Sequence, residues 1–113
     1  MRLKIVGGMN TEKSVKWWNQ HREDFGEILM VGCDARNGIG QLQVIGTKDQ
    51  ATISGCTCGY GGEGPRGTAK ILNDLIETFQ IRGDPPGDKI AQTDHFVIAF
   101  FKEFPVLLDG KIL

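Results

Sequence analysis

The chain of 113 residues contains no long hydrophobic run. Its longest apolar runs, residues 28–31 and 96–101, fall far short of the roughly 20 residues that a membrane-spanning helix needs. Residues 1–8 include basic side chains but only a short apolar stretch, which is not the pattern of a secretory signal. We therefore expect no membrane association and a cytoplasmic location.

The sequence also lacks a strong excess of charge of either sign. Its 13 basic and 14 acidic residues give a formal net charge of −1. This balance provides no overall attraction for nucleic acid or anionic lipid, so we expect no nucleic-acid partner. A hydrophobic content of 40% and a charged content of 24% are ordinary for a folded chain and argue against disorder. The length predicts a single domain over residues 1–113.

Cysteine is scarce and does not follow a metal-binding pattern. Cys33, Cys56 and Cys58 form no pair separated by two residues, and the two histidines, His21 and His95, are far apart. A zinc site made by the three cysteines and one histidine stays an alternative, but the spacing does not support it. We expect neither a metal nor a cofactor.

The spacing of potential catalytic residues also gives little support for an active site, so the sequence favours binding over catalysis. Asp94 and His95 are neighbours in a predicted strand, where adjacent side chains point to opposite faces, and we do not expect them to pair. The remaining catalytic hypothesis is a small cysteine-dependent enzyme. In it Cys58, near the start of a helix, is the nucleophile and His95 is the base.

Glycine is the abundant residue, with 16 copies, which is about twice the usual frequency. The glycines cluster between Gly32 and Gly67 without a regular period. This clustering predicts tight turns between short strands and a close approach of the backbone to a neighbour.

The hydrophobic pattern predicts an α+β fold with element order β-α-β-β-β-α-β. Several strands follow one another between the helices, which favours one mainly antiparallel sheet with both helices packed on it. The strands are expected at residues 2–6, 27–33, 41–47, 51–57 and 95–101, and the helices at residues 11–25 and 68–79.

Three local patterns refine this prediction. The apolar run at residues 28–31 indicates a strand that is buried on both faces, near the centre of the sheet. Residues 82–94 are rich in proline and charge, so we expect an exposed loop there. Asp109 and Gly110 lie between apolar residues and indicate the turn of a further C-terminal hairpin.

The glycine-rich turn from Gly59 to Thr68 is the main functional candidate. Glycines allow several backbone N–H groups to point into one concavity, and the helix that follows adds the positive end of its dipole. Arg66 and Lys70 add positive charge on one helix face, and Tyr60 is free to stack on a base or sugar. The predicted ligand-binding residues are Tyr60, Gly61, Gly62, Gly64, Arg66, Thr68 and Lys70.

Two familiar phosphate-binding motifs do not fit this turn. Gly62, Gly64 and Gly67 have the spacing of a dinucleotide fingerprint, but six residues, 58–63, separate the predicted strand from Gly64, and a hairpin precedes that strand. The P-loop lysine is absent, because Thr68 follows Gly67. We also weigh a purely structural turn, since Glu63 would repel an anion.

The leading hypothesis is therefore a non-catalytic binding protein for a small anionic ligand, phosphate-like or nucleotide-like. The alternative is a homo-oligomeric protein–protein interaction module, which we expect to be a homodimer. Its interface residues would be Trp17, which lies beside His21 on the first helix, and Phe100 in the apolar C-terminal strand.

Overall fold

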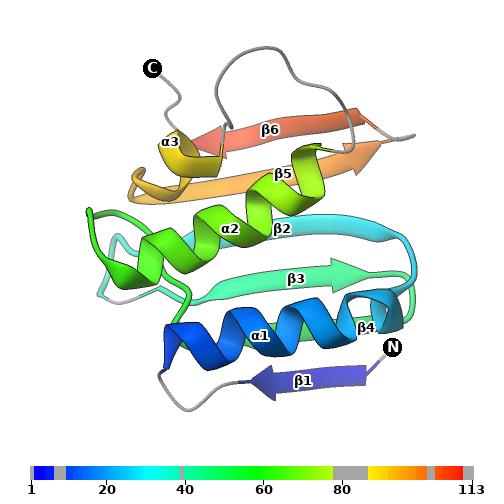
Figure 1. Cartoon of the computed structure of the whole chain (residues 1–113). Helices are drawn as coiled ribbons and strands as arrows, with labels where there is room; N and C mark the ends of the chain where they lie inside the picture. The colour runs from blue at the N-terminus through cyan, green and yellow to red at the C-terminus, as the bar shows by residue number, and fades with distance from the viewer. Residues whose placement is uncertain (1, 7–9, 39, 78–86, 102–103, 111–113) are drawn as a thin grey trace.

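The computed structural model describes residues 2–6, 10–38, 40–77, 87–101 and 104–110. Within these residues six strands form one sheet, and the helices lie together on one side of it (Figure 1). The elements in chain order are β1 (Arg2–Val6), α1 (Thr11–His21), the 3₁₀ helix η1 (Arg22–Phe25), β2 (Ile28–Asp34), β3 (Leu42–Gly46), β4 (Asp49–Ile53), α2 (Glu63–Glu77), α3 (Gly87–Ala91), β5 (His95–Phe101) and β6 (Phe104–Gly110).

The strand order across the sheet is β1-β4-β3-β2-β5-β6. β1 pairs with β4 in parallel, and the other four neighbouring pairs are antiparallel. The predicted α+β class, with one mainly antiparallel sheet and helices packed on it, is confirmed. The C-terminal hairpin consists of β5 and β6, and Asp109 lies within β6 opposite Val97, not in a turn.

Helix α1 begins where its capping residue predicts. The side chain of Asn10 accepts a hydrogen bond from the backbone N–H of Lys13 at 3.0 Å, which satisfies one of the N–H groups that a helix start leaves unpaired. Helix α1 is followed directly by the 3₁₀ turn η1. The chain then reverses at Gly26, whose φ of 71° is a conformation that favours glycine.

The core lies between the sheet and the helices. Trp18 of α1 and Phe25 of η1 are fully buried. Helix α2 adds its predicted apolar face, on which Ile71, Leu72, Leu75 and Ile76 are all buried. Within the described residues, no helix is long and apolar enough to cross a bilayer.

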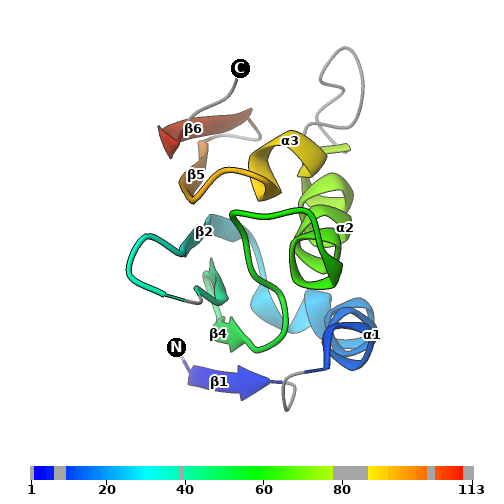
Figure 2. The same cartoon turned by 90° about the vertical axis from the view of Figure 1, so that its left-hand side faces the viewer.

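The expectation that β2 is buried on both faces is wrong, although the strand is central. Burial alternates along it from Met30 onward: Val31 and Cys33 are buried, whereas Met30 and Gly32 are half-buried. The reason is that α1, α2 and α3 all lie on the same side of the sheet, as the view in Figure 2 shows. We call the opposite side, where Met30 lies, the uncovered face.

Several boundaries also differ from the sequence prediction. The strand expected at residues 51–57 is β4 at Asp49–Ile53. α2 begins at Glu63, not at Thr68, so the second half of the glycine-rich turn is the first part of a helix. Pro65 suits this position because the first turn of a helix does not use its N–H groups. The loop expected at residues 82–94 contains α3, whose Ile90 and Ala91 are buried; residues 82–86 lie outside the described residues.

Candidate functional site

The glycine-rich turn forms one side of a hollow at the start of α2. The hollow has a volume of about 170 Å³ and lies between α2 and α3. Four of the predicted ligand-binding residues line it: Tyr60, Gly61, Gly62 and Arg66. Its other lining residues are Pro65, Ala69, Asp88, Ala91 and Gln92.

Tyr60 lies folded across the turn, with half of its surface exposed. Its hydroxyl lies 3.1 Å from Thr57 Oγ1 in a hydrogen bond. A Cβ atom on Gly62 would come within 2.6 Å of Tyr60 Cε2, and one on Gly64 within 2.8 Å of the Tyr60 hydroxyl. These two glycines therefore make room for the tyrosine, and the turn holds its ring in place.

Position 67 requires glycine for a different structural reason. A Cβ atom there would collide with Thr11 Cγ2 and lie 3.2 Å from Cys56 Sγ. Its lack of a side chain lets α2 approach α1 closely. Gly61, in contrast, has no other atom within 4 Å of the position of a Cβ, so contacts inside the chain do not explain it.

The backbone of the turn is partly engaged. Gly59 N–H donates to Ala91 O at 3.0 Å, and Arg66 N–H donates to Gly62 O at 3.1 Å as the first bond of α2. The N–H groups of Glu63 and Gly64 belong to the first turn of the helix, where no carbonyl of the helix itself can accept them. Neither Glu63 nor Gly64 is among the residues that line the hollow.

The structure separates the other predicted residues from this hollow. Thr68 is fully buried, and its hydroxyl has no hydrogen-bond partner among the described residues. Gly64 lies beneath Thr57 and Tyr60. Lys70 is exposed on α2 but is not among the residues that line the hollow.

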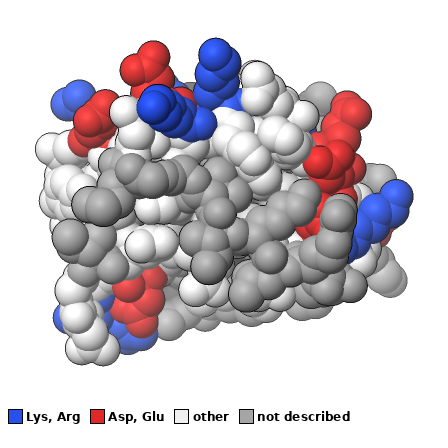
Figure 3. Space-filling model, turned by 90° about the horizontal axis from the view of Figure 1, so that it is seen from below, with Lys and Arg blue, Asp and Glu red and all other residues white. Residues whose placement is uncertain are grey.

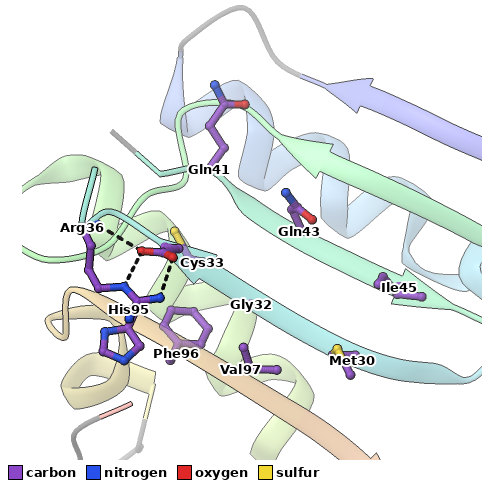
Figure 4. A pocket seen from close by; sticks show the side chains of 11 residues that line it. Met30, Gly32, Cys33, Arg36, Gln41, Gln43, Ile45, His95, Phe96 and Val97 are labelled. Carbon is purple, nitrogen blue, oxygen red and sulfur yellow. Dashed lines mark hydrogen bonds and ion pairs between the residues drawn. The ribbon is translucent and has the colours of Figure 1, made fainter. Parts of the chain in front are cut away.

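A second hollow, which the sequence did not reveal, lies on the uncovered face of the sheet (Figure 4). It has a volume of about 220 Å³ and is centred on Gly32 of β2, where the missing side chain exposes the backbone. A glycine inside an apolar strand was the only signal for it. Its lining residues are Met30, Gly32, Cys33, Asp34, Arg36, Gln41, Gln43, Ile45, His95, Phe96 and Val97.

Charged side chains gather at one end of this second hollow. Arg36 donates to Asp34 Oδ2 from Nη2 at 2.8 Å and to Asp34 Oδ1 from Nε at 3.0 Å, and these hydrogen bonds hold the pKa of Asp34 well below its usual range. His95 Nδ1 lies 2.7 Å from Asp94 Oδ1. The expectation that Asp94 and His95 do not pair is thus wrong, because Asp94 precedes β5 and the alternation of a strand does not apply to it.

The three cysteines are all buried and carry free thiols. Cys58 is only 1% exposed, and the His95 ring is paired with Asp94. Within the described residues, no group of three or more His, Cys, Asp or Glu side chains is arranged to hold a metal ion. The Cys58 nucleophile therefore stays a hypothesis without an open route to its sulfur.

The two predicted interface residues both pack against the core. Trp17 stacks on His21 with ring centroids 4.6 Å apart and meets Phe25 edge-on at 6.2 Å. Phe100 is half-buried and also packs on the core cluster. Neither residue lines either hollow.

The surface charge shows no dominant sign where it is best seen. In Figure 3 the basic and acidic side chains lie side by side along the upper edge, which belongs to the helical layer. An anionic ligand would therefore depend on local groups, not on the field of the whole molecule.

Comparison of the chain with known protein families, with curated proteins and with solved structures finds no match. The function must therefore be argued from the geometry of the chain itself.

Proposed function

We propose that this protein binds a small anionic ligand, phosphate-like or nucleotide-like, at the Gly59–Thr68 turn and does not catalyse a reaction. One observation carries the proposal. The hollow at the start of α2 brings together a half-exposed tyrosine, an arginine and the open backbone of Gly61.

The phosphate would lie against the first turn of α2. There the positive end of the helix dipole favours a negative charge. Arg66, one turn further along, adds a full positive charge and lines the same hollow. The carboxylates of Glu63 and Asp88 oppose this attraction, which lowers the affinity expected for inorganic phosphate alone.

A nucleotide uses the hollow better than phosphate does. The exposed face of Tyr60 provides a stacking surface for a base, and Thr57 and the two glycines beneath the ring hold it in position. Asp88 and Gln92 lie in the same hollow and can accept hydrogen bonds from sugar hydroxyls. Because ligand pockets usually measure about 300–1,000 Å³, a ligand here would be only partly enclosed and its affinity modest.

The test is a thermal-shift panel of inorganic phosphate, nucleoside monophosphates and the corresponding nucleosides. We expect the monophosphates to raise the melting temperature more than the nucleosides, and Arg66→Ala to remove that increase. Lys70→Ala is the matched control, because Lys70 is a cation on the same helix that does not line the hollow. The proposal fails if no phosphorylated ligand shifts the melting temperature, or if Lys70→Ala weakens binding as much as Arg66→Ala.

A homodimer through the uncovered face of the sheet is the second candidate. Met30, Ile45 and Val97 are half-buried on this face, and within the described residues no helix covers it. The half-exposed pair of Asp34 and Arg36 is self-complementary, because a two-fold axis can place each carboxylate near the partner's guanidinium.

The dimer is tested by measuring the molar mass in solution by light scattering. We expect the mass of two chains, and Ile45→Asp should reduce it to that of one chain, since it places a charge in the contact. Gln20→Asp, on the exposed surface of α1, is the control that should leave the dimer intact. A single-chain mass for the unmodified protein would exclude this candidate.

We assign the protein to the cytoplasm as part of the same proposal. The support for this is that all three cysteines are free thiols, which is the state that a reducing compartment maintains.

A further inference from the structure

The hollow on the uncovered face of the sheet follows β2 from a charged end to an apolar end (Figure 4). Asp34, Gly32 and Met30 are alternate residues of β2, so all three face the same side of the sheet. The distance from the first to the last corresponds to about 13 Å of extended strand. The two ends of the hollow therefore offer different chemistry to one small molecule.

Gly32 forms the floor between the two ends. In the pairing of the strands it lies opposite Gln43 of β3 and opposite Val97 of β5. These two longer side chains stand on either side of a position that has none, which hollows the face. A Cβ on Gly32 would lie 3.1 Å from Phe96 O and 3.6 Å from Val97 Cγ2, so a larger side chain there would occupy the floor.

The charged end is formed by Asp34 and Arg36, whose charges cancel. Arg36 donates to the Asp34 carboxylate from its backbone N–H at 3.0 Å, from Nε at 3.0 Å and from Nη2 at 2.8 Å. Two of these bonds end on Oδ1 and one on Oδ2, so within the described residues Oδ2 can accept one more. Both side chains are half exposed, and a ligand in the hollow can therefore reach a negative and a positive group.

Three polar side chains border this end from the neighbouring strands. His95 of β5 lies opposite Asp34, and the distance of 2.7 Å between its Nδ1 and Asp94 Oδ1 restricts its ring. Gln41 and Gln43 line the hollow on the β3 side, and each amide offers both donors and an acceptor. A polar head group would thus meet hydrogen-bonding partners from three strands.

The other end of the hollow is apolar. Met30 lies opposite Ile45 of β3, and Val97 of β5 lies beside the floor. All three are half-buried and line the hollow. An apolar group placed here would leave water without approaching the charged pair, and the flexible thioether of Met30 can adapt to its shape.

We propose that this hollow binds a free α-amino acid with a large apolar side chain. The ammonium group would lie against Asp34 Oδ2 and the carboxylate against the Arg36 guanidinium. The side chain would cross Gly32 toward Met30. A ligand with a single charge would meet a repelling group beside the attracting one, whereas a zwitterion matches both.

The size of the hollow agrees with such a ligand. Its volume of about 220 Å³ is below the roughly 300–1,000 Å³ of sites for drug-sized molecules, which favours a ligand as small as one amino acid. The inference does not depend on the proposed function, because the two hollows share no lining residue. A second copy of the chain on the uncovered face would cover this hollow, so the amino acid and a homodimer would compete for it.

The experiment is titration of the full chain with L-phenylalanine, followed by two-dimensional NMR of the backbone amides. We expect saturable shift changes at residues 30–36, 41–45 and 95–97, at roughly millimolar concentrations. Phenylalanine amide lacks the carboxylate, and N-acetylphenylalanine lacks the ammonium group. Each should bind at least about tenfold more weakly, because one charged contact is lost.

Variants separate the contacts with the head group from those with the floor. Arg36→Gln should weaken the binding of phenylalanine but not that of its amide, which has no carboxylate for Arg36 to bind. Gly32→Val should abolish binding by filling the floor. Arg66→Ala is the matched control, because it removes an arginine from the other hollow and should leave phenylalanine binding unchanged.

Three results would overturn the proposal. They are the absence of saturable shift changes at ten times the expected concentration, shift changes centred outside the three segments, and equal affinity for phenylalanine and either derivative. The titration of the unmodified protein decides between these outcomes even if Gly32→Val does not fold.

Discussion

The replacement of Gly67 by alanine tests whether the glycine-rich turn is built for packing or for a ligand. A Cβ at this position would lie 3.2 Å from Cys56 Sγ and 3.3 Å from Val15 Cγ2, and would collide with Thr11 Cγ2. All three neighbours lie in or near the core, so only small displacements can relieve the contact. The extra methyl group should push α2 away from α1.

The size of the effect follows from two opposing contributions. Alanine in place of glycine inside a helix normally stabilises a protein by about 0.5–1 kcal/mol. Overpacking of a dense core costs about 1–3 kcal/mol. With two contacts at 3.2–3.3 Å and one shorter, we expect the cost to exceed the gain. Gly67→Ala should then lower the free energy of unfolding by about 1–2 kcal/mol and the melting temperature by about 5–10 °C.

Urea denaturation of this variant and of Gly61→Ala provides the measurement. Gly61 belongs to the same turn, but a Cβ there meets no atom within 4 Å, so its replacement should change the free energy of unfolding by less than about 0.5 kcal/mol. If Gly67→Ala is as stable as the unmodified protein, the close approach of α1 and α2 is not what requires glycine at this position.

Three further predictions concern the fold and its charges. Asn10→Ala should destabilise the protein by about 1 kcal/mol through loss of the α1 cap, whereas Asn19→Ala, exposed in the same helix, should have little effect in thermal denaturation. Ser14→Ala should cost about 1–2 kcal/mol in urea denaturation, because its fully buried hydroxyl donates at 2.5 Å to a backbone carbonyl of residue 54 that would lose this partner. The lowered pKa of Asp34 gives a stabilising contribution that is complete above the unfolded-state pKa, near 4, and is lost as the pH falls further. Asp34→Asn should therefore show a weaker loss of stability than the unmodified protein between about pH 4 and pH 2, and identical acid-unfolding curves would contradict the assignment.

The sheet and the two long helices were predictable because their signals are local. The apolar spacing of Ile71, Leu72, Leu75 and Ile76 is enough to define one buried helix face. Asn10 similarly marks the start of α1 through a hydrogen bond to Lys13, which is only three residues away in the sequence. The order of the elements then limits the sheet to a mainly antiparallel arrangement.

The errors arose where a pattern depends on tertiary structure. The apolar run in β2 is compatible with burial on one face or on two, and only the placement of the helices decides between them. α3 is too short to show a helical period, and its burial depends on contacts with α2, such as the hydrogen bond of 2.7 Å from Gly87 N–H to Asn73 Oδ1.

The glycine-rich turn shows why glycine density alone is an ambiguous signal for a ligand. A glycine is required wherever a backbone must lie close to something, and the sequence does not say whether that partner is a ligand or the protein itself. Here Gly62 and Gly64 make room for Tyr60, and Gly67 makes room for α1. Gly61 is the glycine of this turn that such contacts leave unexplained. The case for a ligand therefore depends on Gly61, on Arg66 and on the exposed ring of Tyr60, and no longer on the number of glycines.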